Sequence, residues 1–565
     1  MVTAFARVVG MVFLFAAFWV NAEWSSNYIM RYGSMIPSQG DVSMKLNLLL
    51  FILPATVLGA RILGSREPGL LPGFDRLARL RRAWPWVIAM SLAVLALVAA
   101  VRFGVLRSAP VTDDENVYEF QARIFASGRL YLDSMPSDVR PFFDNQFVVN
   151  DGRWYGLYFT GHPSLLAVAY KLGLEEWLGP IEAALTVLLA CGIARMLFGS
   201  RAALLTGALL VVSPFFIALS ASHLSQPSSS LMLSLFVYSV VRLERTPRAT
   251  VWWGIAAASL SYAVMIRPQT ALSFSLPFVV ALSSRWWRGS LRGGLGGPVV
   301  AGLVLSFGAA VFLFMNHALT GNAFRSGYHA YLLHRGIEWP APFGPYYTIR
   351  EMARALREVN FWQFGWPVSL VFVPLFERRG LAWALAAAPA AVVIGLGLTG
   401  VPSVVTVGPV YYGECIVPLT ILTASGMEQA VSRVRERFGD GVYVRSVLAW
   451  PLVATVGAFM TFIPAQLASI ALMATVALAP YDLAAEKHLD NALVFIRDLP
   501  SIRPVPGAWV FFHRNPKPDL SDRVLFVNDL GAERDVILAR YLPRRTPYTM
   551  HWSNDGMLIV EPLAR

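Results

Sequence analysis

Charged residues are scarce in this chain: only 15% of its 565 residues are Asp, Glu, Lys or Arg, and 56% are hydrophobic. Soluble domains usually carry roughly 25% charged residues. The shortfall comes from long apolar runs such as 84–100 and 301–315, and runs of roughly 17 to 25 apolar residues match the thickness of a bilayer core. The sequence therefore excludes a soluble protein and predicts one that crosses a membrane several times.

Cysteine is also scarce. The two cysteines, Cys191 and Cys415, both lie inside apolar runs, where cysteine usually packs as a small hydrophobic side chain. We expect two buried free thiols and no disulfide.

The net charge of +12 suggests a nucleic-acid partner, but the distribution of arginine argues against one. The arginines gather in short connections between apolar runs, as membrane proteins place them on the cytoplasmic side. These connections are 61–82, 195–201, 242–248, 285–292, 378–379 and 433–445. They alternate with longer connections of mixed charge. We therefore expect a protein of the inner or plasma membrane with a cytoplasmic N-terminus, an odd number of spans and an extracytoplasmic C-terminus.

Length and apolar content predict about thirteen spanning helices. Their expected limits are 5–21, 43–60, 84–104, 177–195, 201–221, 226–242, 249–266, 270–284, 297–316, 366–377, 381–399, 408–426 and 446–464. The apolar run 465–480 either prolongs the last span or lies at the membrane interface. Residues 20–22 (Val-Asn-Ala) leave open a cleaved signal peptide at the start, which would not alter the remaining topology.

Three regions follow from these spans. Residues 1–83 hold two additional N-terminal helices, and residues 84–480 form a transmembrane core with outer loops at 105–176 and 317–365. Residues 481–565 are expected to form a small extracytoplasmic α+β cap, with strands near 509–513, 524–528 and 557–560 and a helix over 484–497. The predicted fold class is thus an α-helical polytopic membrane protein with extracytoplasmic juxtamembrane helices and this C-terminal cap.

An acidic segment opens the first outer loop. Thr112 or Asp113 can cap a helix whose first turn carries Asp113, Asp114 and Glu115, which suits the positive end of the helix dipole. Apolar residues at helical spacing over 117–125 then predict an interfacial helix that ends near residue 128. One interpretation is a capped surface helix and nothing more. The functional interpretation is a group of carboxylates that binds a cation or has one raised pKa, because like charges repel.

Several segments resemble the GT-C superfamily of integral membrane glycosyltransferases, in particular its family 39 and aminoarabinose-transferase-like bacterial branch. Asp114-Glu115-x-x-Tyr118, followed by Ala122 and Gly128, resembles the first-loop motif. Later segments that fit in order are Tyr158-Phe159-Thr160-Gly161-His162-Pro163, Arg267-Pro268, Asn316-His317-Ala318-Leu319-Thr320-Gly321-Asn322 and Gly408-Pro409-Val410-Tyr411-Tyr412-Gly413-Glu414. Val410 departs from the pattern, since related proteins often have arginine there.

The resemblance implies an inverting glycosyltransferase that moves a hexose or pentose from a polyprenyl-phosphate donor to an acceptor hydroxyl outside the cytoplasm. Asp114 would be the general base, and Arg267, or else Arg325, would face the lipid phosphate. Glu115 would orient the acceptor or share a divalent cation, Mg²⁺ or Mn²⁺, with Asp114. The chain has no phosphate-binding loop of the Gly-Lys-Ser type, so no nucleotide cofactor is expected. The expected partners are the lipid-linked donor, a glycan, lipid or protein acceptor, and membrane lipids.

Further polar residues on the same expected side are candidates for substrate binding: Tyr118, His162, His223, His329, Tyr412 and Glu414. His223 either contacts substrate or belongs to a connecting turn. Glu414 is an acid in apolar surroundings, where such residues are usually functional. A group of aromatic residues is expected at the membrane interface rather than as a platform for sugar: Trp339, Tyr346, Tyr347, Phe361, Trp362 and Trp366.

A membrane transporter or a lipid or glycolipid flippase is the alternative function, and a non-catalytic assembly protein is a third. A transporter often has polar residues or broken helices at mid-membrane and an internal repeat. This chain keeps its predicted spans nearly free of charge and places its acids in an outer loop. The sequence therefore favours the transferase, and the intact Asp114–Glu115 pair argues against an inactive relative.

The alternation of arginine-rich connections generates a prediction about topology. Single cysteines placed at positions 114, 325 and 520 should react with a membrane-impermeant thiol reagent added from the extracytoplasmic side. Labelling of any of these positions only from the cytoplasmic side would contradict both the topology and the proposed chemistry.

Overall fold

The computed structural model of the chain describes residues 48–67, 69–79, 83–246, 249–288, 294–336, 345–398, 407–497, 513–553 and 557–563. The predicted span 5–21 with its alternative cleavage site, Trp339, the side chains of Tyr346 and Tyr347, and most of the predicted strand 509–513 lie outside the described residues.

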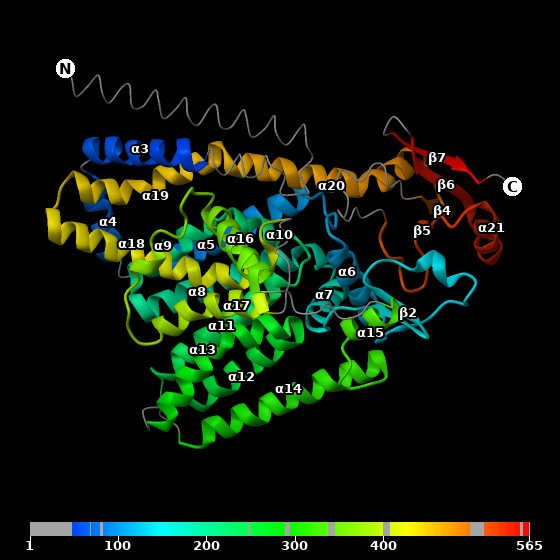
Figure 1. The fold of residues 1–565 in the computed structure, drawn as a ribbon, viewed down its shortest axis with the longest axis horizontal. Helices are drawn as coiled ribbons and strands as arrows, with labels where there is room; N and C mark the ends of the chain where they lie inside the picture. Colours follow the sequence, from blue (N-terminus) through cyan, green and yellow to red (C-terminus); the bar gives the residue numbers. More distant parts are fainter. Residues whose placement is uncertain are drawn as a thin grey trace.

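The molecule is built on a bundle of helices with the shorter polar segments gathered at one end, here named the loop end (Figure 1). The bundle helices are α3 (Leu53–Arg66), α4 (Leu70–Arg79), α5 (Trp84–Ala100), α8 (Leu178–Phe198), α9 (Ser200–Val211), α10 (Pro214–Ala221), α11 (Gln226–Leu243), α12 (Ala249–Ile266), α13 (Pro268–Trp287), α14 (Gly296–Thr320), α16 (Pro345–Phe364), α17 (Ala382–Leu398), α18 (Ile416–Phe438), α19 (Val442–Met460) and α20 (Phe462–Glu486). Helices α6 (Asp113–Ala126), α7 (Gly161–Leu172), α15 (Gly327–His334) and α21 (Ala532–Tyr541) lie at the loop end.

Several of these helices are fit to cross a membrane. Within the described residues, five stretches are long and apolar enough: 48–66, 84–105, 175–198, 296–320 and the joined α19–α20 stretch 442–486. Helices α9 and α10 make a sixth candidate, although they are bent by 59° at the break before Pro214. The chain is an integral membrane protein, and the full number of about thirteen spans stays a prediction.

The predicted span over 366–377 is wrong. Helix α16 ends at Phe364, Gly365 takes a positive φ of 71°, and the chain then forms turns with one short 3-10 helix, η5 (Val373–Leu375). Pro367 and Pro374 explain the difference, because proline lacks the N–H that a helix needs and clashes with the preceding turn.

The aromatic residues of this region are not an interface belt. Phe361 and Trp362 are each 2% exposed and Trp366 is fully buried. The Trp362 ring packs edge-on against Phe462 at 5.4 Å. These three side chains therefore belong to the core of the bundle. The two cysteines are buried free thiols, as expected.

The arginine-bearing connections meet at the end opposite the loop end. The contacts that join them include Arg445 Nε to the Gly64 carbonyl (2.6 Å), Arg379 Nε to the Leu197 carbonyl (2.8 Å) and Arg201 to Glu428 (3.7 Å). The structure thus separates arginine-rich connections from the polar loops, as the alternation of charge predicted. Which end faces the cytoplasm stays a prediction.

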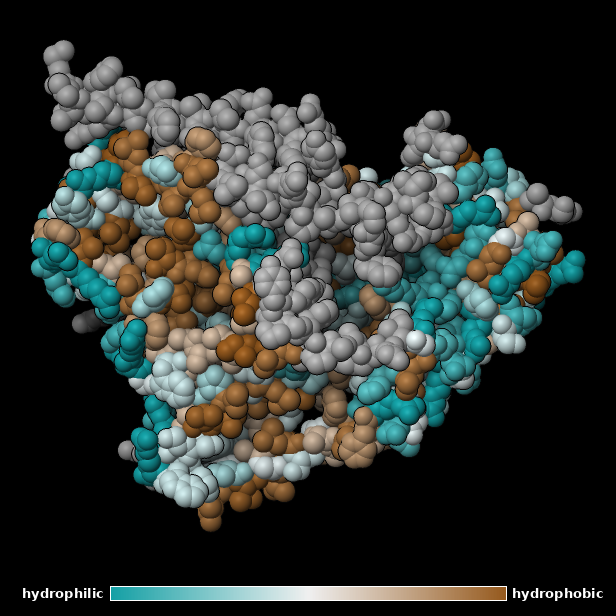
Figure 2. Space-filling view, viewed as in Figure 1, coloured by the Kyte–Doolittle hydropathy of each residue, from teal (hydrophilic) through white to brown (hydrophobic). Residues whose placement is uncertain are grey.

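Two small sheets stand at the loop end. The first is antiparallel with order β1-β3-β2, from β1 (Leu132–Asp133), β2 (Val148–Asp151) and β3 (Arg153–Gly156). The second has order β5-β4-β6-β7, from β4 (Ala492–Ile496), β5 (Val524–Asn528), β6 (Thr546–Trp552) and β7 (Leu558–Pro562), and β4 runs parallel to both of its neighbours. Figure 2 shows hydrophilic residues over this end and hydrophobic residues over the helices.

The C-terminal region mixes strands and helix, but one predicted element is wrong. The expected strands 524–528 and 557–560 correspond to β5 and β7. The expected helix over 484–497 is replaced by the last turn of α20, a bend in which His488 and Asn491 have positive φ, and strand β4. The run Ala-Leu-Val-Phe-Ile suits a fully buried parallel strand, and all five residues are buried.

Helix α7 approaches the end of α12 closely, and glycine permits this. A Cβ added at Gly161 would lie 2.7 Å from the Met265 carbonyl carbon and 2.8 Å from the Ile266 backbone nitrogen. The Tyr262 hydroxyl donates to the Gly161 carbonyl at 3.0 Å. This contact fixes the start of α7 beside residue 267.

Replacement of Gly161 by alanine should therefore separate α7 from α12. We expect Gly161→Ala to destabilise the protein by about 1–3 kcal/mol, the usual cost of overpacking, measured by thermal melting in detergent. Gly302→Ala is the control, because Gly302 lies within helix α14 and nothing lies within 4 Å of a Cβ added there. A smaller loss for Gly161→Ala than for the control would contradict the close contact.

Candidate active site

Helix α6 begins at the acidic segment and is held there by a capping box. The Thr112 hydroxyl accepts a hydrogen bond from the Glu115 amide at 3.2 Å, and the Glu115 carboxylate accepts one from the Thr112 amide at 3.1 Å. Such a reciprocal pair satisfies two N–H groups that the helix leaves unpaired. The cap is Thr112, and the alternative of Asp113 as the cap is wrong.

The rest of α6 is buried in the protein, so the expectation of a helix lying on the membrane surface is wrong. Val117, Phe120 and Ile124 are at most 1% exposed. The polar face is covered too, because the C-terminal segment crosses it: the Asn515 amide donates to Oδ1 of Asn116 at 2.9 Å. The sequence shows one apolar stripe on this helix, and such a pattern does not indicate that the opposite, polar face is covered by hydrogen bonds from a distant segment.

Asp114 is held by Tyr158, which lies in the loop between β3 and α7. The Tyr158 hydroxyl donates a hydrogen bond to Oδ1 of Asp114. Burial raises the pKa of Asp114, while the hydrogen bond from Tyr158 and the charge of Arg267 lower it. Asp114 and Arg267, predicted to serve one site, therefore lie close enough for their charges to interact.

Arg267 occupies the break between α12 and α13 and forms an ion pair with Glu414. The Arg267 Nε lies 2.9 Å from Oε1 of Glu414, whose side chain is fully buried. Glu414 belongs to the 3-10 helix η6 (Val410–Cys415). The guanidinium also lies 5.7 Å from the ring centre of Tyr411. A guanidinium has five N–H donors, so one carboxylate leaves donors free for an anionic ligand.

Four tyrosines from separate elements surround these charges: Tyr118 of α6, Tyr158, Tyr328 of α15 and Tyr411 of η6. We name them the tyrosine cluster. The ring centres of Tyr118 and Tyr158 lie 4.6 Å apart, and those of Tyr158 and Tyr328 lie 5.4 Å apart. The Tyr118 hydroxyl donates to Oγ of Ser225 at 3.0 Å. The cluster adds hydroxyl groups and ring faces to a site with two carboxylates, Asp114 and Glu414, and one cation, Arg267.

Glu115 points away from this cluster. Its Oε1 accepts a hydrogen bond from the His223 amide at 2.7 Å, and its Oε2 accepts from the Val111 amide at 2.8 Å, besides the Thr112 contacts. Glu115 is fully buried. Burial raises its pKa, and the charge of Arg102 and the His223 hydrogen bond lower it. The carboxylate therefore ties the start of α6 to the turn at residues 222–225.

His162, near the start of α7, contacts the turn that carries His223. The His162 ring is committed at both nitrogens, with Nδ1 2.9 Å from Oγ of Ser228 and Nε2 2.9 Å from the His223 carbonyl. The His223 Nδ1 lies 3.0 Å from Oε1 of Glu119. Both histidines are buried, and these contacts suit positioning rather than direct contact with substrate.

Three other candidates have different surroundings. Tyr412 is 3% exposed and packs in the bundle core. His329 is exposed on α15. Arg325 lines a separate cavity of about 600 Å³ between the first sheet and the end of α14. The structure therefore favours Arg267 over Arg325 as the cation nearest the candidate base.

The donor set does not favour a cation shared by Asp114 and Glu115. Both Glu115 oxygens already accept hydrogen bonds from amides, so Glu115 could bind a cation only by giving up some of them. Within the part of the chain that the structure describes, no group of three His, Cys, Asp or Glu side chains could hold a metal ion. The divalent cation stays a prediction.

Sequence reasoning missed the role of Tyr158 and of Tyr411. Both lie in segments that resemble family motifs, but a motif does not state which side chain meets which. Tyr158 and Asp114 are 44 residues apart in the sequence. Only the packing of α7 against α6 brings the hydroxyl to the carboxylate.

Several known proteins are similar to this chain. Residues 177–316 match the family model of dolichyl-phosphate-mannose-protein mannosyltransferase. ArnT from Cupriavidus metallidurans in the apo state is similar in structure, with a TM-score of 0.50 and 15% identity over 83% of this chain and 93% of that chain. ArnT from the same organism bound to undecaprenyl phosphate gives a TM-score of 0.48 and 16% identity over 86% and 97% of the two chains. Arabinosyltransferase EmbB from Mycobacterium smegmatis gives 0.40 and 16% over 79% and 45%. No curated protein sequence matches the chain.

The chain shares the fold of ArnT. Over residues 177–316 it carries the sequence pattern of the mannosyltransferase family, and this stretch contains Arg267 and His223. The resemblance to the GT-C superfamily that the motifs indicated is confirmed.

Asp113, the first residue of α6, generates a prediction about pH. Burial and the neighbouring charge of Asp114 raise the pKa of Asp113 from 3.8 to about 7. Between these values the folded protein holds a proton that the unfolded chain has lost, so stability falls as pH rises towards 7.

We therefore expect Asp113→Asn, which stays neutral, to stabilise the protein more at pH 8 than at pH 5, by on the order of 2 kcal/mol. Thermal melting of both proteins at the two pH values measures this. Asp138→Asn, on an exposed part of the same loop, should show no such difference. An equal effect of Asp113→Asn at both pH values would show that Asp113 has an ordinary pKa.

Proposed function

We propose that this protein transfers a sugar from a polyprenyl-phosphate donor to an acceptor hydroxyl at the loop end of the bundle, on the extracytoplasmic side. The observation that carries the proposal is that one carboxylate, Asp114, and one cation, Arg267, are brought to the same site. Asp114 accepts a hydrogen bond from Tyr158, and the nearby charge of Arg267 lowers its pKa. Arg267 in turn forms an ion pair with Glu414. Transfer from a lipid phosphate needs one base and one anion-stabilising group.

Asp114 is the proposed general base. Its carboxylate accepts the proton of the acceptor hydroxyl while the hydroxyl oxygen attacks the anomeric carbon. The bond from that carbon to the phosphate oxygen breaks, and its electron pair leaves with the lipid phosphate. A single displacement from the face opposite the phosphate inverts the anomeric configuration. Burial helps here because it raises the pKa of Asp114 and makes the carboxylate a stronger base.

Arg267 is the proposed partner of the departing phosphate. Its guanidinium is pinned on one side by Glu414 at 2.9 Å, so it does not have to reorganise when negative charge develops. Preorganised donors of this kind are among the largest contributors to catalysis. ArnT, whose fold this chain shares, is known bound to undecaprenyl phosphate, which supports a lipid phosphate as the donor class.

The tyrosine cluster and the turn beneath it are proposed to shape the sugar site. Tyr118 and Tyr328 present aromatic rings next to the carboxylate, and sugars bind well against such rings because their C–H faces are apolar. His162 and His223 hold the turn that supports Tyr118 through Ser225. Glu115 is proposed to orient Asp114 through the cap rather than to bind the acceptor itself.

Removal of the base should abolish transfer without unfolding the protein. We expect Asp114→Asn to lower turnover about 100- to 10,000-fold, the range for a lost general base. The assay is consumption of labelled polyprenyl-phosphate sugars by purified protein, with thermal melting as the check on folding. Arg267→Ala should also lower turnover, because the leaving phosphate loses its cation.

Matched variants separate the neighbouring acids. Asp138→Asn should leave turnover unchanged, and Asp113→Asn should have a smaller effect than Asp114→Asn. Near-normal turnover of Asp114→Asn with loss in Asp113→Asn would move the base to Asp113. If both acid variants keep normal turnover, the proposed mechanism is wrong.

A further inference from the structure

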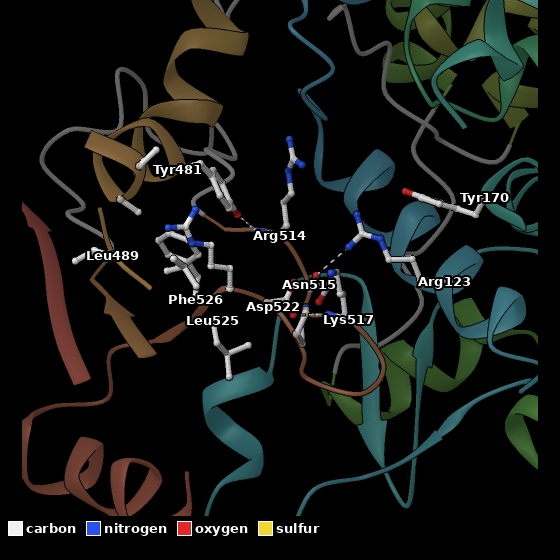
Figure 3. Close-up of a pocket in the computed structure, with 15 residues that line it drawn as sticks. Arg123, Tyr170, Tyr481, Leu489, Arg514, Asn515, Lys517, Asp522, Leu525 and Phe526 are labelled. Carbon is white, nitrogen blue, oxygen red and sulfur yellow. Dashed lines mark hydrogen bonds between the residues drawn. The ribbon is translucent and has the colours of Figure 1, made fainter. Parts of the chain in front are cut away.

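A cavity separate from the one lined by Arg325 lies between α6 and the C-terminal region (Figure 3). Its volume is about 460 Å³, within the usual range for a small-molecule site. Arg123 of α6, Tyr170 of α7 and Tyr481 of α20 form part of the wall, and the C-terminal segment supplies the rest. We name it the basic cavity.

Four cations line the basic cavity against one acid. They are Arg123, Arg514, Lys517 and Arg523, and the acid is Asp522. Two of the cations are already paired, Arg123 with Glu119 at 3.0 Å and Arg523 with Asp490 at 2.9 Å.

Arg514 and Lys517 differ from the other two cations. Neither forms an ion pair with an acid of the described residues, and Lys517 is exposed. The Arg514 guanidinium lies 5.2 Å from the ring centre of Tyr481, and its Nε is buried without a hydrogen-bond partner. Figure 3 shows both side chains, with Asn515 between them in the chain.

Asn515 supplies an independent sign of a missing ligand. Asn515 is 2% exposed. Its Oδ1 accepts a hydrogen bond from Nδ2 of Asn145 at 2.8 Å, and its backbone amide donates one to Oδ1 of Asn116. The Asn515 Nδ2 is buried and has no partner. A buried donor left unpaired costs stability, so an acceptor atom from a bound molecule would satisfy it.

We propose that the basic cavity binds a phosphate group carried by the acceptor. The proposal rests on the function proposed above, because it assigns the second substrate of the same enzyme. Arginine and lysine with an amide N–H beside them are the donors that bind phosphate oxygens. The phosphate can belong to a lipid-linked acceptor or to a soluble phosphorylated glycan, and the chemistry of recognition is the same.

Helix α6 sets the geometry of that acceptor. Asp114 and Arg123 lie nine positions apart on one helix, which corresponds to about 14 Å along its axis. The donor phosphate is assigned to Arg267, near the start of α6, and the basic cavity lies near its end. An acceptor that reaches both Asp114 and the cavity must therefore be larger than one sugar.

A binding experiment tests the cavity without any turnover. Inorganic phosphate and pyrophosphate are titrated into the full-length protein in detergent by calorimetry, at constant ionic strength in chloride. We expect saturable binding that Arg514→Gln weakens about tenfold and Lys517→Gln weakens severalfold, since each removes a charged hydrogen bond. Arg540→Gln, exposed on α21 and outside the cavity, should bind as the wild type does. Lys517→Gln keeps the test valid if Arg514→Gln fails to fold.

A turnover experiment identifies the source of the phosphate. With a phosphorylated acceptor, Arg514→Gln and Lys517→Gln should raise KM with little change in kcat, while the same acceptor without phosphate should show no difference between variants. Lipid-linked and soluble phosphorylated acceptors are assayed in parallel, and the one whose KM responds is the natural class. The KM for the lipid-linked donor, whose phosphate is assigned to Arg267, should be unchanged in both variants.

The outcomes separate the two proposals. Absence of phosphate binding to the wild type, or an equal effect of Arg514→Gln and Arg540→Gln, would overturn the basic cavity as a phosphate site. Unchanged KM for a phosphorylated acceptor in both cavity variants would overturn its role in acceptor binding. Phosphate binding that depends on Arg514, without sugar transfer from any donor, would retain the cavity as a phosphate site and refute the transferase.

Discussion

The buried carboxylate of Glu115 is the contact on which the geometry of the site depends. It accepts hydrogen bonds from the backbone of residues 111 and 112 and from the His223 amide, which is 108 residues away in the sequence. A buried carboxylate is tolerated only when such donors satisfy it. These bonds fix the first turn of α6, and from this turn the preceding residue, Asp114, accepts the hydrogen bond of Tyr158 near the charge of Arg267. Glu115 therefore has a structural role, and the proposed chemical role belongs to its neighbour, Asp114.

A chain of polar contacts continues from this point along α6. The Arg102 Nε lies 2.6 Å from Glu176, and its guanidinium also approaches His223 at 3.2 Å. The His223 ring then faces Glu119, which pairs with Arg123. Burial raises the pKa of Glu119, but the His223 hydrogen bond and the Arg123 charge outweigh it and lower the pKa to about 2. Glu119 thus stays ionised and links the active-site turn to the basic cavity.

The fold class, the resemblance and the capped acidic helix start could be predicted because they depend on local patterns. Hydrophobic run length predicts membrane helices, and Thr112 with Glu115 three residues later is a local capping signal. The roles within the acidic segment could not be predicted in this way. Asp113 and Asp114 carry the same side chain at adjacent positions, and only the hydrogen bond from Tyr158 and the nearby charge of Arg267 distinguish Asp114. The errors at 366–377 and 484–497 have the same origin, because apolar content alone does not separate helices from proline-interrupted turns or buried strands.

The crossing of α6 by the C-terminal segment bears on the order of folding. Asn116 receives its hydrogen bond from Asn515, a residue 399 positions later, and Asn528 of β5 donates to the carbonyl of Pro141 in the first loop. A chain made from its N-terminus folds its early parts first, so the first loop reaches its final place before its last partners exist. The polar face of α6 is then uncovered until the C-terminal segment reaches the same side of the membrane. A chain that stops before residue 513 would therefore have its bundle and its acidic turn, yet it would lack the cover that closes the helix between them.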